Sequence, residues 1–411
     1  MMLGSPGHPH LTYCTNIHPG ETWDEVRDNL QRYLLNVKAQ VAPDRPFGIG
    51  LRLSAQAADD LAKPAALEAF SSFLQTHDLY VFTLNGFPYG QFHEKPVKEQ
   101  VYLPDWLDER RLRYTNQLAE LLAALLPLGS KFGHLEGSIS TVPGAFRSRI
   151  TGDADVACLA DRLLRHLAVL HHIRERTGRI VSLALEPEPC CFLETVAETI
   201  AFFEGWLFSQ QAVDRLGTLT GMARRESEAF LRRHLGVCVD ACHMAVEFED
   251  PDAVVRALQA AGIRIGKIQI SAGLRVWLDD NWQEHRASLT RFSENVYLHQ
   301  VVERRHGTLT RYTDLPDALE ALSGAATGDA EWRIHFHVPL FCEHLGLFVN
   351  TQEFLRRLLV LIRTEALSQH LEIETYTWHV LPEEYRSEDI VTSITRELRW
   401  VLQQVPCDLN G

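Results

Sequence analysis

The sequence lacks several features that would assign the chain to a class at once. No apolar stretch approaches the length of a membrane span, and the longest candidate, residues 121–128, is far shorter. There is no Cys-x-x-Cys pair, and no Gly-x-Gly-x-x-Gly turn follows the first β-rich run. Lys and Arg total 40 against 54 Asp and Glu, which leaves a formal charge of −14. Because phosphate contacts need clustered basic residues, we do not expect a nucleic-acid partner. The short apolar runs lead us to expect no membrane span.

What remains is the composition of an ordinary globular protein. The chain has 411 residues, of which 45% are hydrophobic and 9% aromatic, and this excludes a disordered protein. The eight cysteines form no disulfide framework, and residues 1–9 carry neither the basic nor the apolar region of a signal peptide. We therefore expect a cytoplasmic location with mostly buried thiols, and an oligomer is compatible with the sequence.

Short β-rich runs alternate with longer helical patterns along the whole chain. Eight β-then-α units in a chain of this length predict an α/β fold of the (β/α)8 or TIM barrel type. An open doubly wound sheet is the alternative, and the missing glycine-rich turn counts against it. The predicted strands are residues 11–17, 47–53, 79–84, 131–137, 180–186, 235–241, 265–271 and 371–376.

One long segment does not fit the repeating unit. Residues 272–350 contain a hairpin signal at Arg304-Arg305-His306-Gly307, between two extended runs, and a further extended run at 332–340. We interpret 1–411 as a single barrel domain with 272–350 inserted after strand seven. Such an insertion lies at the C-terminal mouth of a barrel, where it can act as a lid. A rival count that makes 332–340 the eighth strand is disfavoured because it leaves nine strands.

The period of two along the strands places hard-oxygen side chains on one face. Glu186, Asp240, Gln269 and Glu374 each belong to the inward set of consecutive strands, near the C-terminal end. Three buried carboxylates aimed at one point repel each other, and a divalent cation would resolve this. The oxygen ligands favour Mg²⁺ or Mn²⁺, and Zn²⁺ or Co²⁺ would also fit, especially if His243 contributes. The alternative is that each carboxylate pairs with a Lys or Arg such as Lys267.

Other polar and aromatic residues are expected around the same mouth. A polar group at a strand end can hold a substrate hydroxyl, or it can simply cap a loop or helix. His335 and His337 alternate in one extended run, and we expect His335 to belong to a polar strand face and His337 to reach into the mouth. The predicted substrate-binding set is Asn16, His18, Arg52, Asn85, His337 and Trp378.

Three features of the sequence resemble a known family. Leu185-Glu-Pro-Glu-Pro189, the Asp240-x-x-His243 segment and the strand-final Glu374 are similar to the xylose isomerase-like TIM barrel superfamily of sugar isomerases and epimerases. The resemblance implies one metal held by Glu186, Asp240, Gln269 and Glu374, with Gln269 standing where the family usually has His, and His243 beside the sugar. The opening segment Tyr13–Glu21, the turn Asn85–Tyr89 and the overall length are similar to one branch of this superfamily, the EboE metabolite traffic proteins.

The sequence thus predicts a metal-dependent isomerase or epimerase of a sugar-like or small carbonyl metabolite. The metal would stabilise an enediolate, Glu186 and Glu374 would move the proton, and His243 would orient a substrate oxygen. A non-catalytic metabolite-binding protein of the EboE type that keeps the metal pocket is the alternative, favoured by Gln269. A phosphodiester endonuclease is a third reading, against which the charge of −14 counts.

Overall fold

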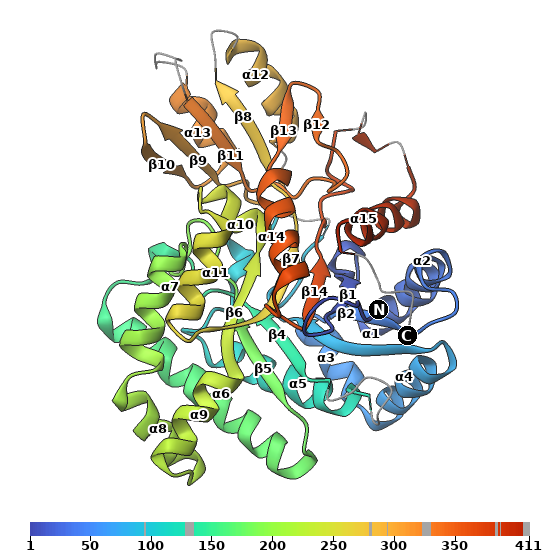
Figure 1. The fold of residues 1–411 in the computed structure, drawn as a ribbon, viewed down its shortest axis with the longest axis vertical. Helices are drawn as coiled ribbons and strands as arrows, with labels where there is room; N and C mark the ends of the chain where they lie inside the picture. The colour runs from blue at the N-terminus through green and yellow to red at the C-terminus, as the bar shows by residue number, and fades with distance from the viewer. Residues whose placement is uncertain are drawn as a thin grey trace.

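The structure of the chain is a computed structural model. The structure describes residues 1–93, 96–127, 135–278, 282–293, 295–322, 330–382, 385–386 and 388–405. Two sheets organise these residues, one parallel with eight strands and one antiparallel with six (Figure 1).

The parallel sheet is the predicted barrel. Its strands pair in the order β1-β14-β7-β6-β5-β4-β3-β2, so neighbours in sequence are neighbours in space, and every named pair is parallel. The strands are β1 His10–Tyr13, β2 Phe47–Arg52, β3 Leu79–Asn85, β4 Gly137–Thr141, β5 Val181–Leu185, β6 Leu235–Asp240, β7 Arg264–Ile270 and β14 His370–Ile373.

The two outermost strands meet and close the sheet. The Thr12 hydroxyl on β1 donates to the carbonyl of Gly48 on β2 at 2.7 Å, and Cys14 forms a parallel bridge with Gly50. Gly50 has no side chain because Glu372 fills the space beside it: an added Cβ would lie 1.9 Å from a Glu372 oxygen. The contacts between β1 and β2 close the sheet into a barrel, and this rules out the alternative of an open doubly wound sheet.

Helices follow most of the barrel strands and cover them from outside, as a right-handed β-then-α repeat requires. Several begin with a side-chain cap, such as Thr22 before α1 and Thr195 before α7. The helices are α1 Trp23–Asn29, α2 Leu35–Val41, α3 Ala55–Leu61, α4 Pro64–Thr76, α5 Glu109–Leu125, α6 Asp153–Thr177, α7 Val196–Phe202, α8 Gln210–Thr220, α9 Arg224–His234, α10 Ala241–Val246, α11 Pro251–Ala260, α12 Trp282–Leu289, α13 Leu315–Ala321, α14 Gln352–Thr364 and α15 Ile390–Gln404.

The antiparallel sheet is built from the segment after β7 and stands beyond one end of the barrel, next to α10 (Figure 1). Its strand order is β10-β9-β11-β8-β13-β12, and β9 and β10 form the hairpin expected around Arg304–Gly307. The extended run at 332–340 therefore contributes to a separate sheet and not to the barrel. The strands are β8 Leu274–Leu278, β9 Val301–Arg305, β10 Thr308–Tyr312, β11 Ala330–Ile334, β12 His344–Leu345 and β13 Phe348–Asn350.

One predicted strand was placed wrongly. The fourth barrel strand is Gly137–Thr141 and not 131–137, of which residues 131–134 lie outside the described part. Its sequence, Gly-Ser-Ile-Ser-Thr, is poor in apolar residues because Ser138 and Ser140 face the polar barrel interior, where they contact Thr83 and Lys267. Hydrophobicity alone does not mark such a strand.

Two further expectations concern the chain as a whole. None of the helices within the described residues has the length and apolar character needed to cross a membrane. Seven cysteines are free thiols, and the eighth, Cys407, lies outside the described residues.

Candidate metal centre

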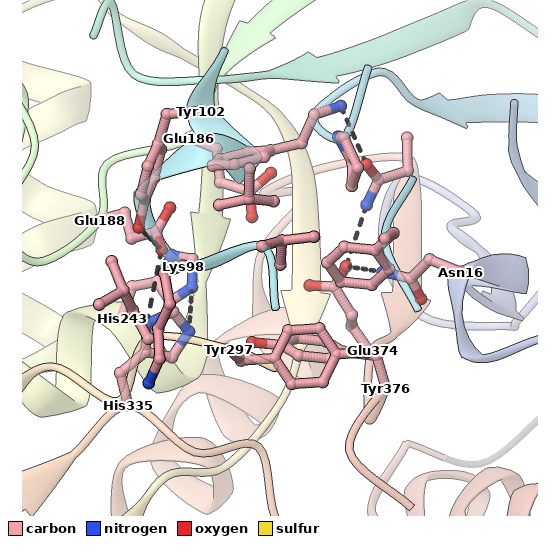
Figure 2. A pocket seen from close by; sticks show the side chains of 17 residues that line it. Asn16, Lys98, Tyr102, Glu186, Glu188, His243, Tyr297, His335, Glu374 and Tyr376 are labelled. Carbon is pink, nitrogen blue, oxygen red and sulfur yellow. Dashed lines mark hydrogen bonds and ion pairs between the residues drawn. The ribbon is translucent and has the colours of Figure 1, made fainter. Parts of the chain in front are cut away.

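Three buried carboxylates converge at the C-terminal end of the barrel strands. Glu186 follows β5 directly, Asp240 is the last residue of β6, and Glu374 follows β14. Each offers one oxygen, and these oxygens all lie within 4.8 Å of one another. All three side chains are almost fully buried. Glu186 and Glu374 are seen around the pocket in Figure 2.

The two carboxylate oxygens of Asp240 have different roles: one stabilises the local fold, and the other has no hydrogen-bond partner among the described residues. Its Oδ1 caps α10 by accepting the backbone N–H of His243 at 3.0 Å, and it also accepts the Ser271 hydroxyl at 2.7 Å. Its Oδ2 is buried and has no hydrogen-bond partner among the described residues. The Asp-x-x-His spacing therefore holds the aspartate rigidly while leaving one oxygen available.

Glu374 is held by three side-chain amides. Its Oε1 accepts from Asn16 at 2.7 Å and from Asn85 at 2.9 Å, and its Oε2 accepts from the Gln269 nitrogen. Amide donors on both oxygens favour the ionised carboxylate and fix its orientation.

This arrangement changes the expected roles of the three amides. Gln269 turns its nitrogen to Glu374, while its Oε1 accepts from the Cys238 thiol at 2.9 Å, so the expected carbonyl ligand is not presented here. Asn16 and Asn85 line the pocket, and each donates an amide N–H to Glu374, so both help to hold this carboxylate, while their contact with substrate hydroxyls stays a prediction.

Glu186 differs from Glu374 because its Oε2 has no hydrogen-bond partner in the described part of the chain. Burial raises the pKa of the Glu186 carboxyl well above its usual range, and the charges of Glu374 and Asp240 raise it further. Burial likewise raises the pKa of Glu374, and Asp240 is its main charged neighbour. Without a cation, the cluster is therefore driven to take up protons.

Lys267, inside the barrel, pairs with a different carboxylate and not with Glu186, Asp240 or Glu374. Lys267 on β7 and Glu372 on β14 are both fully buried, and their charged atoms are 2.5 Å apart. The expected alternative, in which Lys267 pairs with one of the three mouth carboxylates, is thus replaced by a pair with a fourth carboxylate below them.

His337 comes from the segment after β11 and offers a further ligand. Its Nδ1 donates to the backbone carbonyl of Glu374 at 2.7 Å, which leaves Nε2 as an unprotonated acceptor. That Nε2 is buried without a hydrogen-bond partner among the described residues. Asp240, His243 and His337 form a second group whose ligand atoms lie within 4.8 Å of one another.

His335 belongs to the site and not to a solvated strand face, contrary to expectation. Its Nε2 lies 3.1 Å from Nε2 of His243, and Glu188 completes a third group of ligand atoms within 4.8 Å. The Nδ1 of His243 lies 3.0 Å from the Pro187 carbonyl oxygen, so the backbone fixes the orientation of this ring. The expected role of His243 in orienting a substrate oxygen stays a prediction.

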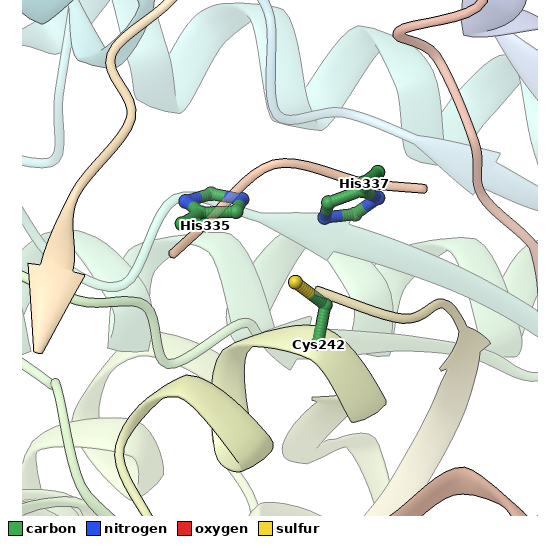
Figure 3. Close-up of side chains that lie close together, drawn as sticks. All are labelled: Cys242, His335 and His337. Carbon is green, nitrogen blue, oxygen red and sulfur yellow. The ribbon is translucent and has the colours of Figure 1, made fainter. Parts of the chain in front are cut away.

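A thiol lies beneath the two histidines of the inserted segment. Figure 3 shows Cys242 on α10 pointing toward the space between His335 and His337, and the three offer ligand atoms within 4.8 Å. Burial raises the pKa of the Cys242 thiol well above its ordinary value. Because the thiolate is the metal-binding form, an ion bound here would have to displace the thiol proton.

The carboxylates open into a pocket with aromatic walls. It encloses about 50 Å³, room for a few water molecules, so a larger ligand requires its side chains to move. The inserted segment supplies part of the wall through Tyr297, Leu298 and His335 (Figure 2). Other lining residues include Phe87, Phe92, Lys98, Tyr102, Glu188 and Tyr376.

Four expected substrate-binding residues do not line this pocket, namely His18, Arg52, Trp378 and His337, and His337 lies instead among the candidate metal ligands. Arg52 is 2% exposed, and its guanidinium pairs with Glu21 at 3.1 Å, so it ties the end of β2 to a loop. His18 stacks on Tyr33 with ring centroids 4.4 Å apart. His18 and Trp378 line a neighbouring cavity. The substrate-binding role of these residues stays a prediction, since their side chains are not among those that line the pocket.

Glu188 and Tyr102 were not expected at the site. Burial raises the pKa of Glu188 to about 8, and the Tyr102 hydroxyl donates to its Oε1 at 2.7 Å. The Glu-Pro-Glu spacing was the available signal for Glu188, because a residue two positions beyond a strand-final ligand shares its direction. Tyr102 carries no comparable signal, since it ends the short 3-10 helix Lys98–Tyr102 between β3 and α5.

No family model matches the chain, and no curated protein matches it. Similar solved structures include a xylose isomerase-like TIM barrel protein from Mycobacterium smegmatis in complex with magnesium, 11% identical with a TM-score of 0.48, covering 97% of this chain and 96% of that one. D-psicose 3-epimerase with D-tagatose from Clostridium cellulolyticum H10 is 10% identical with a TM-score of 0.46, covering 96% and 97%. The probable 3-DHS dehydratase AsbF from Bacillus anthracis is 12% identical with a TM-score of 0.44, covering 95% and 97%. At these values the similarity assigns no function to this chain.

Proposed function

We propose that the chain is a metal-dependent isomerase or epimerase of a sugar-like or small carbonyl metabolite, of the xylose isomerase-like type. The observation that carries the proposal is the convergence of Glu186, Asp240 and Glu374 within 4.8 Å at the buried barrel mouth. Buried like charges at this spacing favour a divalent cation.

The residues fit such an ion. Glu186 Oε2, Asp240 Oδ2 and His337 Nε2 are buried acceptor atoms without hydrogen-bond partners among the described residues. Three carboxylates with one imidazole form a mixed set that suits Mn²⁺, Co²⁺ or Zn²⁺, and Mg²⁺ with more difficulty. His337 thereby takes the ligand position that Gln269 was expected to fill.

A bound divalent cation would polarise a carbonyl and its neighbouring hydroxyl, which acidifies the C–H bond between them. Glu186 is the residue placed to accept that proton, because it lines the pocket and its Oε2, unlike the oxygens of Glu374, has no hydrogen-bond donor among the described residues. Glu374 is instead locked by three amide donors, so it holds charge and geometry. The aromatic walls would pack against the C–H face of the substrate and exclude water.

We extend the proposal to the inserted segment 272–350, which would cover the mouth. Tyr297 on this segment lies 5.1 Å from Tyr376 between ring centroids, and Tyr376 follows the strand that leads to Glu374. Because the pocket is small, entry of a substrate requires this cover to shift. Slower amide exchange in residues 295–305 on substrate binding would support a cover, and unchanged exchange would contradict it.

The activity can be tested without knowing the substrate. A panel of ketoses and hydroxycarbonyl compounds is incubated in D₂O with protein and Mn²⁺, and deuterium entering a C–H next to the carbonyl is followed by NMR. We expect exchange with at least one compound, its loss on chelation, and its loss in Glu186→Gln. Glu175→Gln, an exposed change on α6, is the control that should exchange normally. Exchange that survives in Glu186→Gln would contradict the assigned role.

A metabolite-binding protein of the EboE type that keeps the metal pocket is the second candidate. The Gln269 amide favours it, because its nitrogen stabilises Glu374 as an anion without adding a ligand. Metal-dependent binding of a panel compound with no deuterium exchange would favour this candidate over the enzyme.

A further inference from the structure

Two buried imidazoles face each other beside the carboxylate cluster. His243 on α10 and His335 after β11 are both almost fully buried, and their Nε2 atoms are 3.1 Å apart (Figure 2). In an ordinary hydrogen bond one of these nitrogens would carry a proton and the other would not.

The other ring nitrogens settle which tautomers are present. His243 Nδ1 lies 3.0 Å from the Pro187 carbonyl oxygen, which can only accept, so Nδ1 carries the proton. His335 Nδ1 lies 2.8 Å from Gln300 Oε1. The Gln300 nitrogen donates to the Pro189 carbonyl at 3.2 Å and to the Tyr102 hydroxyl at 2.8 Å, which fixes that amide with its oxygen toward His335. His335 Nδ1 therefore also carries the proton.

Both Nε2 atoms are consequently unprotonated in the neutral rings, and two lone pairs meet at 3.1 Å. Such a contact is repulsive unless a cation lies between or beside the nitrogens. A shared proton is one such cation, and a metal ion bound to both neutral rings is the other. A metal ion needs no change in the tautomers that the Pro187 and Gln300 oxygens impose.

Glu188 supplies the third donor and the negative charge. Its Oε1 accepts from Tyr102, while its Oε2 is buried without a hydrogen-bond partner in the described residues. Glu188, His243 and His335 each offer one ligand atom within 4.8 Å of the other two, and Glu188 Oε1 also lies 3.5 Å from the protonated Nδ1 of His335. Two nitrogens bound to one tetrahedral Zn²⁺ at 2.0–2.1 Å are roughly 3.3 Å apart. The observed 3.1 Å is close to that spacing.

We propose that Glu188, His243 and His335 form a second divalent-cation site, adjacent to the carboxylate centre. Two imidazole nitrogens with one carboxylate oxygen suit Zn²⁺ or Co²⁺ better than Mg²⁺. All three residues line the pocket, so a fourth coordination position faces the space where a ligand binds. Asp240 Oδ1 lies 3.9 Å from His243 Nε2, which places the two sites side by side. This inference extends the proposed function, but its test counts ions and needs no turnover.

The test is the number of ions per chain. Protein is stripped with chelator, dialysed against Zn²⁺, freed of excess metal and analysed by mass spectrometry of the elements. We expect two ions in the wild type, one in His335→Gln and one in Glu188→Gln. His166→Gln alters a buried histidine on α6, away from the site, and should keep two. Asp240→Asn should lose the first ion and keep the second.

A single ion in the wild type would overturn the second site, as would two ions that survive both His335→Gln and Glu188→Gln. Three ions would also contradict the arrangement. In ¹⁵N NMR of the histidine rings, we expect Zn²⁺ to shift both Nε2 signals; a protonated Nε2 that Zn²⁺ leaves unchanged would identify a shared proton instead. Two ions without any deuterium exchange would refute the isomerase and leave this site standing.

Discussion

The buried pair of Lys267 and Glu372 allows a quantitative prediction. Their charged atoms are 2.5 Å apart and both side chains are fully buried. At an effective dielectric constant of about 20, the attraction is roughly 7 kcal/mol. In Lys267→Met this attraction is lost, and Glu372 then has the option of taking up a proton. A carboxyl group with the ordinary glutamate pKa of about 4.3 needs roughly 4 kcal/mol to be protonated at pH 7, and roughly 1 kcal/mol at pH 5.

Protonating Glu372 costs less free energy than the lost attraction to Lys267. Protonation therefore limits how much stability the single variant loses. The double variant Lys267→Met/Glu372→Gln has no carboxyl at position 372. The difference in stability between the single and double variants therefore measures the free energy of protonating Glu372. We expect the single variant to be less stable than the double by about 4 kcal/mol at pH 7 and by about 1 kcal/mol at pH 5. Urea unfolding in chelator, followed by circular dichroism, measures both gaps. Equal gaps at the two pH values, or no gap at pH 7, would refute the reasoning.

Three further changes probe other parts of the account. Glu331→Gln should lower the unfolding free energy by about 3–5 kcal/mol in urea, because this carboxylate is 1% exposed and pairs with three arginines of the antiparallel sheet; a loss under 1 kcal/mol would contradict it. Burial raises the pKa of Glu397 from 4.5 to about 8, so the folded form binds the extra proton and stability falls as pH rises across that interval. Glu397→Gln should flatten this slope in thermal melts from pH 5 to 8, and an unchanged slope would place the titration elsewhere. Gln269→His should tighten Zn²⁺ binding at least about tenfold by calorimetry, since it adds an imidazole ligand beside Glu374 where Gln269 supplies none; weaker binding would show that the amide matters for holding Glu374.

The barrel was predictable because alternation along strands is a strong signal. The period of two placed Glu186, Asp240 and Glu374 on inward faces, and consecutive parallel strands bring such positions together. The fourth strand escaped because its inward residues are serines, which carry no hydrophobic pattern. Strand alternation therefore located the carboxylates well and the polar strand poorly.

The inserted segment is where the sequence was least informative. His335 and His337 lie in an extended run whose alternation correctly puts them on one side, but the identity of their partners depends on how a separate sheet docks on the barrel. The contacts of Glu188 were equally hard to predict, because it lies between β5 and α7 and its partner Tyr102 comes from a distant segment. Contacts between segments this far apart in the chain have no local signature.

Side-chain orientation was the other limit. Gln269 was expected to present its oxygen, yet Glu374 takes its nitrogen because a buried carboxylate accepts whichever donor can reach it. Arg52 was expected at the mouth, but Glu21 draws its guanidinium to the side. A strand position determines which face a residue occupies, while the nearest opposite charge determines where its tip ends.

The central claim is that Glu186, Asp240 and Glu374 hold one divalent cation. A crystal grown with Mn²⁺ and measured for anomalous scattering tests it most directly. We expect a peak about 2.0–2.3 Å from an oxygen of each carboxylate, with His337 Nε2 as a further ligand, and no such peak in Asp240→Asn. A wild-type crystal with no anomalous peak among these three side chains would contradict the account.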